Sequence, residues 1–338
     1  MKLSIIIPVF NVEKYLSNCL NSLLRQGLDQ SEFEIIAIND GSTDNSLKIL
    51  NEFSNSFSNF QIHNYINKGP GAIRNIGIDL SQGDYIYYID SDDYLVDDSL
   101  AYILYQAFEY DLDIVTFNTT LTRSLSLTEL TTQLPSTDTF EVLNGYAYLS
   151  KYNYRNEVWW YIIKKDYLDK LGEKLVEHRW LEDAIFTVKV LLSSNRIMHL
   201  PINVHRYFKR PNSLTAINRN VNDVKMIHNM VDVVKDYRDV VKQVNLIEYD
   251  KKQCLVNNVK AKQQSFVFFM LVRVLKSHMK FEEVKLILSE VIKAKAYPMY
   301  SFPKAKNTSF SYSFLSRLFN NKLIFFILFK VLNPFLKK

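Results

Sequence analysis

Two kinds of hydrophobic pattern alternate along the first 120 residues of the chain. Short apolar runs predict strands over residues 3–10, 34–38, 84–89 and 113–117, and the first of these reads as buried on both faces. Residues 61–66 predict a weaker strand. Between these strands, apolar positions recur every three or four residues, which predicts helices over 13–26, 44–53, 71–81 and 100–108. Strands that alternate with helices at this interval predict an α/β fold with a mostly parallel sheet flanked by helices.

The pattern changes in the second half of the chain. Residues 120–215 show no clear period, whereas 221–244, 249–276 and 281–296 have the spacing of successive helices. We therefore expect an α/β domain over 1–215 with halves 1–118 and 119–215. A helical C-terminal extension over 216–298 and a tail over 299–338 are expected to follow it.

Polar residues follow three of the predicted strands directly. Asn11, Asn39-Asp40 and Asp90-Ser91-Asp92 stand where the strands end, and the carboxyl ends of parallel strands meet in one crevice. Strand alternation would point Asp90 and Asp92 to the same side. Two converging carboxylates repel each other unless a cation lies between them, which predicts a Mg²⁺ or Mn²⁺ site. The alternative is a surface turn that is merely rich in aspartate.

The sequence lacks the usual glycine-rich phosphate loops. Pro8-Val9-Phe10-Asn11 follows the first strand in place of G-x-G-x-x-G, and no P-loop occurs. A metal ion and basic side chains would then have to neutralise the negative charge of a bound phosphate group. Lys68 and Arg74 lie in a glycine-containing turn that opens a helix, a place that favours phosphate. An ordinary helix start with a solvated arginine is the alternative.

The net charge of +5 is unevenly distributed. Residues 300–338 hold seven basic and no acidic residues, and subtracting this +7 from +5 leaves −2 for residues 1–299. A near-neutral body argues against nucleic-acid binding.

Cys19 and Cys254 form neither a metal spacing nor a disulfide framework, which favours a reducing compartment. The apolar start is cut short by Pro8, so we interpret it as a strand and not as an export signal.

The basic tail contains a short apolar run, Leu323–Phe329. Seven apolar residues are far fewer than the roughly 20 that cross a bilayer. With Arg317, Lys322 and Lys330, the run predicts an amphipathic helix within 312–338 that lies on an anionic membrane surface. We expect three phenylalanine rings to insert there: Phe325, Phe326 and Phe329. A helix packed on the protein itself or on a partner subunit is the alternative.

Four motifs in this order resemble the family 2 glycosyltransferases of the GT-A fold. They are Ser4-Ile-Ile-Ile-Pro8-Val-Phe-Asn11, Asn39-Asp40-Gly-Ser-Thr-Asp44, Ala72-Ile-Arg74-Asn75-Ile-Gly77 and Ile89-Asp90-Ser91-Asp92-Asp93. The resemblance implies a Rossmann-like sheet, a nucleotide-diphospho-sugar donor, a divalent metal and an inverting reaction. Asn39 stands where many members have Asp, and Ile73 where many have Ala.

The resemblance also implies roles for individual residues. Asp40 would bind the nucleobase, most often uracil, in a pocket lined by Pro8 and Phe10. Arg74 would lie near the base or the diphosphate. Asp90 would bind ribose or metal, and Asp92 would be the main metal ligand. The remaining candidates for donor binding are Asn11, Lys68 and Ser91.

A later stretch, Trp180-Leu181-Glu182-Asp183, resembles the family's Glu-Asp motif at a helix start. By this likeness Asp183 is the general base that an inverting transfer needs, with Glu182 as the second choice. A plain helix cap is the alternative. Weaker likenesses to an aromatic stretch and a closing loop add acceptor or loop candidates: Trp159, Trp160, Trp180, Lys209 and Arg210. For the two adjacent tryptophans, core packing is the alternative to stacking on a sugar.

The expected function is transfer of a sugar from a nucleotide-diphospho-sugar, such as a UDP-sugar, to a hydroxyl of a glycan or lipid-linked acceptor. By the resemblance, the setting is bacterial surface polysaccharide synthesis, in the cytoplasm at the inner face of the membrane. Two other functions stay open. One is a sugar nucleotidylyltransferase, and the other is a catalytically silent glycan-binding or scaffold subunit with the same fold.

Overall fold

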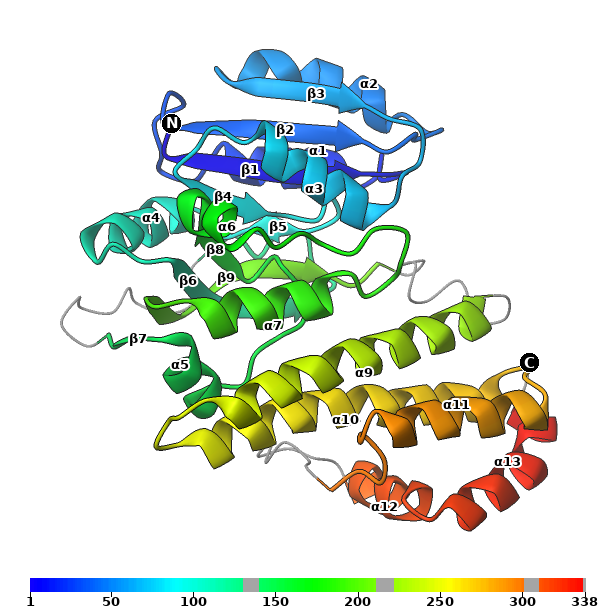
Figure 1. Ribbon diagram of the computed structural model, residues 1–338. Coiled ribbons are helices and arrows are strands. Elements are labelled where there is room, and N and C mark those ends of the chain that lie inside the picture. The colour runs from blue at the N-terminus through cyan, green and yellow to red at the C-terminus, as the bar shows by residue number, and fades with distance from the viewer. Residues whose placement is uncertain (130–139, 211–221, 301–309, 337–338) are drawn as a thin grey trace. The chain divides into compact units, whose positions relative to one another are not determined.

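The computed structural model describes residues 1–129, 140–210, 222–300 and 310–336 (Figure 1). The chain divides into two compact units. Unit 1 comprises residues 1–148 and 155–211, and unit 2 comprises 149–154 and 212–338.

A mixed nine-stranded sheet forms the centre of unit 1, with the strands in the order β3-β2-β1-β4-β8-β6-β9-β5 and with β7 paired to β9. The strands are β1 Leu3–Val9, β2 Phe33–Asn39, β3 Phe60–Asn64, β4 Tyr85–Tyr88, β5 Tyr94–Leu95, β6 Ile114–Thr122, β7 Val142–Leu143, β8 Tyr161–Lys164 and β9 Ile197–Phe208. Strands β3, β2, β1 and β4 run parallel, as the sequence predicts. Strand β8 runs antiparallel to both β4 and β6.

Helices connect these strands (Figure 1). They are α1 Leu16–Leu23, α2 Ser46–Phe53, α3 Pro70–Leu80, α4 Ser99–Glu109, α5 Gly145–Lys151, α6 Lys165–Leu171 and α7 Asp183–Ser193, with a 3₁₀ turn η1 at Ser54–Ser56. The α/β fold is therefore confirmed. The described part of the stretch from 120 to 215, which lacks a clear period, contains β7, β8, β9, α5, α6 and α7, so its sequence pattern concealed regular structure.

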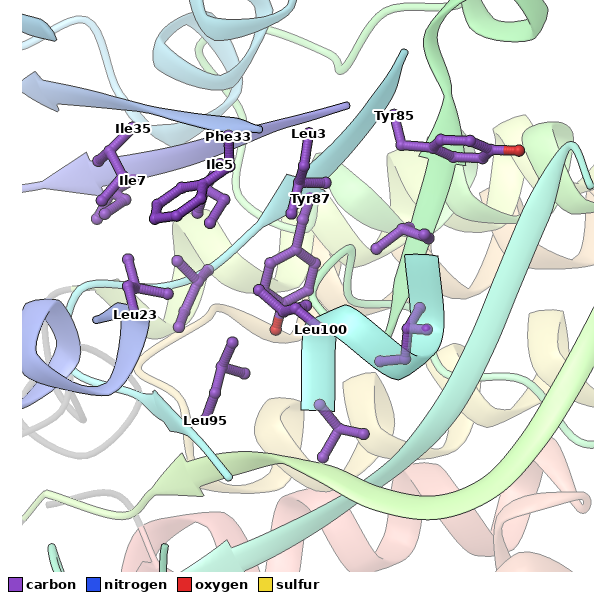
Figure 2. Packing of buried hydrophobic residues seen from close by; sticks show 14 of the residues in the cluster. Leu3, Ile5, Ile7, Leu23, Phe33, Ile35, Tyr85, Tyr87, Leu95 and Leu100 are labelled. Atoms are coloured by element: carbon purple, nitrogen blue, oxygen red, sulfur yellow. The ribbon is translucent and has the colours of Figure 1, made fainter. Parts of the chain in front are cut away.

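Both faces of β1 are buried. Figure 2 shows Leu3, Ile5 and Ile7 packed with side chains of β2, α1 and α4, all within one hydrophobic cluster. On the other face Ile6 is fully buried and meets α3 at Gly77. A Cβ atom at Gly77 would lie 2.4 Å from the Cγ2 atom of Ile6. The glycine thus allows α3 to lie close against the central strand.

Unit 2 is helical. It contains α9 Asn222–Leu246, α10 Lys252–Lys276, α11 Phe281–Lys293, α12 Phe310–Phe319 and α13 Lys322–Leu336. Helices α9, α10 and α11 agree closely with the ranges that the sequence predicts. The buried amide of Gln263 on α10 donates to the carbonyls of Val234 and Ala294, so one side chain joins α10 to α9 and to the end of α11.

The tail requires a correction. It forms two helices, which a turn at Asn320 and Asn321 separates. Phe325 and Phe329 are buried, and they lie next to the rings of Phe319 and Phe281 respectively. The expectation that these two phenylalanines insert into a membrane is therefore wrong, because unit 2 already covers them. Within the described residues, no helix combines the length and hydrophobicity that a membrane span requires.

The close approach of α3 to β1 leads to a first prediction. Replacing Gly77 by alanine places a methyl group on Ile6, and overpacking of this kind costs about 1–3 kcal/mol. This exceeds the gain of up to about 1 kcal/mol that alanine brings to a helix. We expect a net fall in the free energy of unfolding of unit 1. All three tryptophans lie in unit 1, so their fluorescence during urea unfolding reports on that unit.

Asn21→Ala, at an exposed position of α1, is the matched control and should change the unfolding midpoint little. A Gly77→Ala protein as stable as the wild type would show that α3 can move away from β1 without cost.

Candidate active site

The loops after β1 and β2 are tied together by hydrogen bonds. Asn11 has a left-handed backbone, with φ of 51°, which an asparagine tolerates. Its backbone N–H donates to the hydroxyl of Ser42, and its side-chain oxygen accepts the N–H of Thr43 at 2.8 Å. Asn11 therefore shapes the rim where these strands end, which is a role the sequence pattern did not indicate.

Asp40 lies buried at the end of β2. Its two carboxylate oxygens accept the backbone N–H groups of Lys68 at 2.6 Å and of Gly69 at 3.0 Å. Asp40 thus holds the turn that begins α3, while the Lys68 side chain is exposed with its Nζ 5.7 Å from the ring centre of Tyr65. Each carboxylate oxygen keeps a further lone pair for a ligand.

Pro8 lies in the neighbouring strand β1, and Phe10 is the residue that directly follows this strand. Pro8 is partly buried, and Phe10 is 38% exposed although it is a large apolar side chain. A partly exposed ring beside Asp40's strand can contact the flat face of a base.

Three carboxylates converge after β4. Oxygen atoms of Asp90, Asp92 and Asp93 lie within 4.8 Å of one another. A turn, and not the strand alternation that the sequence predicts, brings these carboxylates together. Strand β4 ends at Tyr88, and in residues 90–93 the backbone N–H of Asp93 donates to the carbonyl of Asp90. Ser91 is buried in the same turn.

The three aspartates have different surroundings. Both oxygens of Asp93 are occupied, one by Nε2 of His205 at 2.8 Å and one by the N–H of Phe208 at 2.8 Å. Asp90 and Asp92 are only partly buried. Burial, reinforced by the neighbouring carboxylates, raises the pKa of Asp92 to about 7. A pair of carboxylates that destabilise each other's charge fits a hard divalent cation, Mg²⁺ or Mn²⁺.

Asp93 and His205 form a buried network that sequence reasoning missed. Nδ1 of His205 hydrogen-bonds to the hydroxyl of Tyr87 at 2.8 Å, and burial lowers the pKa of this histidine to about 3. The ring of Trp159 stacks on His205 with centres 4.4 Å apart. Asp93 stands in the recognised aspartate run, but no local signal links it to a histidine 112 residues later.

The five aromatic and loop candidates differ in how far they are buried. Trp159 and Trp160 are each 3% exposed, which supports core packing, and Trp180 is half-buried in the loop before α7. Lys209 is exposed. Nε of Arg210 lies 2.9 Å from a carboxylate oxygen of Asp92, and its guanidinium is 5.9 Å from the ring centre of Tyr15. The remainder of this expected loop, residues 211–213, lies outside the described residues.

Arg74 connects the two halves of the site. Its buried guanidinium donates one hydrogen bond to Asp90 at 2.7 Å and another to Glu182. Although burial alone would lower it, these carboxylates keep the pKa of Arg74 above its usual value. Arg74 therefore joins the turn after β4 to Glu182, the residue before α7, which lies 108 positions from Arg74 in the chain.

Asp183 is the first residue of α7 and differs from its neighbour Glu182. Glu182 is buried and paired with Arg74. The carboxylate of Asp183 has no hydrogen-bond partner among the described residues. Burial and the charge of Glu182 raise the pKa of Asp183, and Arg74 partly opposes them. Such a half-buried carboxylate can accept a proton from a bound hydroxyl.

Comparison with known proteins bears on this geometry. Residues 4–170 match the model of the family described as "Glycosyl transferase family 2". The chain carries a family 2 glycosyltransferase domain. The match begins in β1 and ends within α6, so it includes Asp40, Arg74 and the aspartate turn but stops before Asp183.

Three relatives illustrate the likeness. The poly(ribitol-phosphate) beta-glucosyltransferase of Bacillus spizizenii is 45% identical over 102 residues, covering 30% of this chain and 16% of that protein. The uncharacterized glycosyltransferase EpsJ of Bacillus subtilis is 29% identical over 218 residues, covering 63% of each. The solved structure of Staphylococcus aureus TarS 1–349 with UDP matches with a TM-score of 0.64 and 21% identity, covering 87% of this chain and 81% of that one.

The first two relatives extend beyond the matched part. The chain spans 16% of the first and 63% of the second. The solved structure, at 21% identity, supports the GT-A fold.

The buried bridge through Arg74 leads to a second prediction. Removing one partner of a buried ion pair costs about 3–5 kcal/mol, because it leaves the other charge unpaired. We expect Arg74→Met to lower the stability of unit 1 by about this much. Glu182→Gln should cost much less in the Arg74→Met background than alone. Urea unfolding of the four proteins in this double-mutant cycle gives the coupling energy.

The exposed pair Lys170 and Asp166 on α6 is the matched control, with a coupling of roughly 0–1 kcal/mol expected. Equal coupling in both cycles would contradict a structural role for the Arg74 bridge.

Proposed function

We propose that this domain transfers a sugar from a nucleotide-diphospho-sugar to a hydroxyl of a glycan or lipid-linked acceptor, with inversion at the anomeric carbon. One observation carries the proposal. A single guanidinium, that of Arg74, contacts both the aspartate turn suited to a metal and the residue that precedes Asp183. A donor held at the turn and a base at the start of α7 are thereby brought into one site.

Asp183 would take the proton from the acceptor hydroxyl as its oxygen attacks the anomeric carbon. The new bond forms on the face opposite the diphosphate, and the bond to the diphosphate oxygen breaks with its electron pair. A divalent cation, Mg²⁺ or Mn²⁺, held by Asp92 and Asp90 would neutralise the charge of the leaving diphosphate. Glu182 would orient Arg74, and Arg210 beside Asp92 would meet further phosphate charge.

The donor is proposed to be a UDP-sugar. Asp40 would accept a hydrogen bond from uracil through its remaining lone pairs, with Phe10 and Pro8 against the base. The relative solved with UDP has the same fold, and this supports the assignment. Lys68, Asn11 and Ser91 would shape the surrounding loops, since the backbone of Lys68 and the side chain of Asn11 already hold them.

The acceptor is proposed to belong to bacterial surface polysaccharide synthesis, as the name of the poly(ribitol-phosphate) relative suggests. A lipid-linked acceptor would place the enzyme at the inner face of the cell membrane, attached through residues within 312–338.

The two alternative functions are a catalytically silent subunit and a nucleotidylyltransferase. Donor hydrolysis that requires a divalent metal would exclude the silent subunit, and release of nucleoside diphosphate without a triphosphate substrate would exclude the nucleotidylyltransferase.

A nucleotide panel tests the donor directly. Thermal shift with UDP, GDP, ADP and CDP, each with and without Mn²⁺, should give the largest rise in unfolding temperature with UDP and Mn²⁺. A ligand that binds the folded state stabilises it by mass action. A preference for another base would reject the UDP assignment while leaving the reaction class intact.

The metal assignment leads to a third prediction. Asp92→Asn removes the charge of the main ligand, and metal stabilisation of a leaving group is worth several kcal/mol. We expect transfer to fall at least ~10³-fold and UDP binding to lose its dependence on Mn²⁺. Asp97→Asn, at an acid paired with Arg25 outside the turn, is the control and should retain activity. Full wild-type activity in excess chelator would refute the metal site.

The raised pKa of Asp183 leads to a fourth prediction. The base form is lost as pH falls through this pKa, so kcat/KM should decline on the acid side at a pH above the ordinary carboxyl range. Asp183→Asn should lower kcat at least ~10²-fold and abolish this acid limb, with UDP affinity nearly unchanged. An acid limb that persists in Asp183→Asn would transfer the role to Glu182, which Glu182→Gln would then test.

A further inference from the structure

Helix α13 has two opposite apolar faces. Phe325, Phe329 and Asn333 are buried on the inner face. We define the outer stripe as the residues Leu323, Ile327, Val331 and Phe335, which are 72%, 60%, 56% and 83% exposed. Successive residues of a helix are about 100° apart, so positions 323 and 325 point in nearly opposite directions. The outer stripe is therefore a continuous exposed apolar face that repeats every four residues.

The residues of the inner face hold α13 to the rest of unit 2. Phe325 contacts Phe319 edge-on, and the ring of Phe329 stacks against Phe281. The side-chain amide of Asn333 donates to the carbonyls of Leu275 and Ser277 at 3.1 and 2.7 Å. The outer stripe is not needed for this packing, so its apolar character requires another explanation.

Positively charged residues lie on α13 and beside the ring of Phe281. Nζ of Lys330 and Nζ of Lys285 lie 4.6 and 4.7 Å from the ring centre of Phe281, and Nζ of Lys322 lies 5.7 Å from that of Phe326. We call these three lysines the basic rim. Glu282 pairs with Lys285 and offsets the charge of that lysine, whereas Glu283 accepts the backbone N–H of Lys280. The charge of the rim therefore rests on Lys322 and Lys330, which are both exposed. From residue 300 to 338 the chain has no acidic residue at all.

We propose that the outer stripe of α13 binds the surface of an anionic lipid bilayer, with the helix axis parallel to the membrane. The apolar side chains enter the headgroup and acyl boundary, and the basic rim meets lipid phosphates. A helix of 15 residues is about 22 Å long, shorter than the roughly 30 Å hydrocarbon core, so it lies on the bilayer and does not cross it.

Charge favours lipid over a second copy of the chain as the occupant. Two outer stripes placed face to face would bring two basic rims together with no acids of the tail to offset them. An anionic bilayer supplies both the apolar interior and the negative charge. The contact face is also the reverse of the one the sequence predicts, since the buried Phe325 and Phe329 hold the helix to the protein.

Co-sedimentation of the full chain with lipid vesicles tests the proposal, without nucleotide, so that its outcome is independent of the glycosyltransferase activity. The vesicles are phosphatidylcholine with or without phosphatidylglycerol. Wild-type protein should bind only the vesicles with phosphatidylglycerol, and salt should weaken binding. The double variant Ile327→Ser/Val331→Ser should bind at least ~10-fold more weakly, since each apolar side chain contributes to insertion. Leu246→Ser, 84% exposed on α9, is the matched control and should bind normally.

A charge variant provides the second arm. Lys322→Gln/Lys330→Gln should lose most of the salt-sensitive binding, whereas Lys242→Gln/Lys251→Gln, at exposed positions near the turn between α9 and α10, should not. UDP-induced thermal shifts like those of the wild type, or matching circular dichroism if UDP does not bind, confirm that each variant is folded. Equal binding by stripe variant and wild type, or no vesicle binding, would overturn the proposal. Concentration-dependent dimers that the stripe variant abolishes, without vesicle binding, would assign the face to a second copy.

Discussion

The repulsion among three carboxylates after β4 is the constraint around which the site is arranged. Asp90, Asp92 and Asp93 lie within 4.8 Å of one another, and unpaired charges at this distance in a partly buried place are unfavourable. The protein relieves this repulsion residue by residue. Arg74 pairs with Asp90, Arg210 with Asp92, and His205 together with the backbone N–H of Phe208 with Asp93. These partners come from two segments of the chain, because Arg74 lies on α3 whereas His205, Phe208 and Arg210 lie on β9 or just after it.

This arrangement joins distant elements. The Asp93–His205 contact ties the aspartate turn to β9, and Arg74 ties the same turn to the start of α7. A change at the turn therefore reaches both Arg210 and the residues around Asp183. The three aspartates also differ in how they are bound. Both oxygens of Asp93 are engaged by protein groups and position the turn, whereas Asp90 and Asp92 are partly exposed and can reach a ligand.

Unit 2 illustrates how one helix can have two apolar faces with different purposes. Phe325 and Phe329 are packed inside the unit, while Leu323 and Ile327 are largely exposed. Hydrophobicity alone does not distinguish these positions, because all four residues are strongly apolar. The packing partners Phe319 and Phe281 decide which side is inside, and the exposed lysines Lys322 and Lys330 of the same helix favour an anionic surface for the other side.

By itself, the sequence determined the alternating α/β pattern, the parallel strands at the start of the sheet and the helical extension, because these depend on local periodicity. It also indicated Asp40, Arg74 and the aspartate run as candidate site residues, through motifs that are contiguous in the chain. Only the tertiary structure decided that Arg74 bridges to Glu182, that His205 engages Asp93, and that β8 inserts antiparallel between β4 and β6. Those features join residues between 45 and 112 positions apart, and periodicity within a segment carries no information about which distant segment becomes its neighbour. The orientation of α13 was decided in the same way, by the rings it packs against.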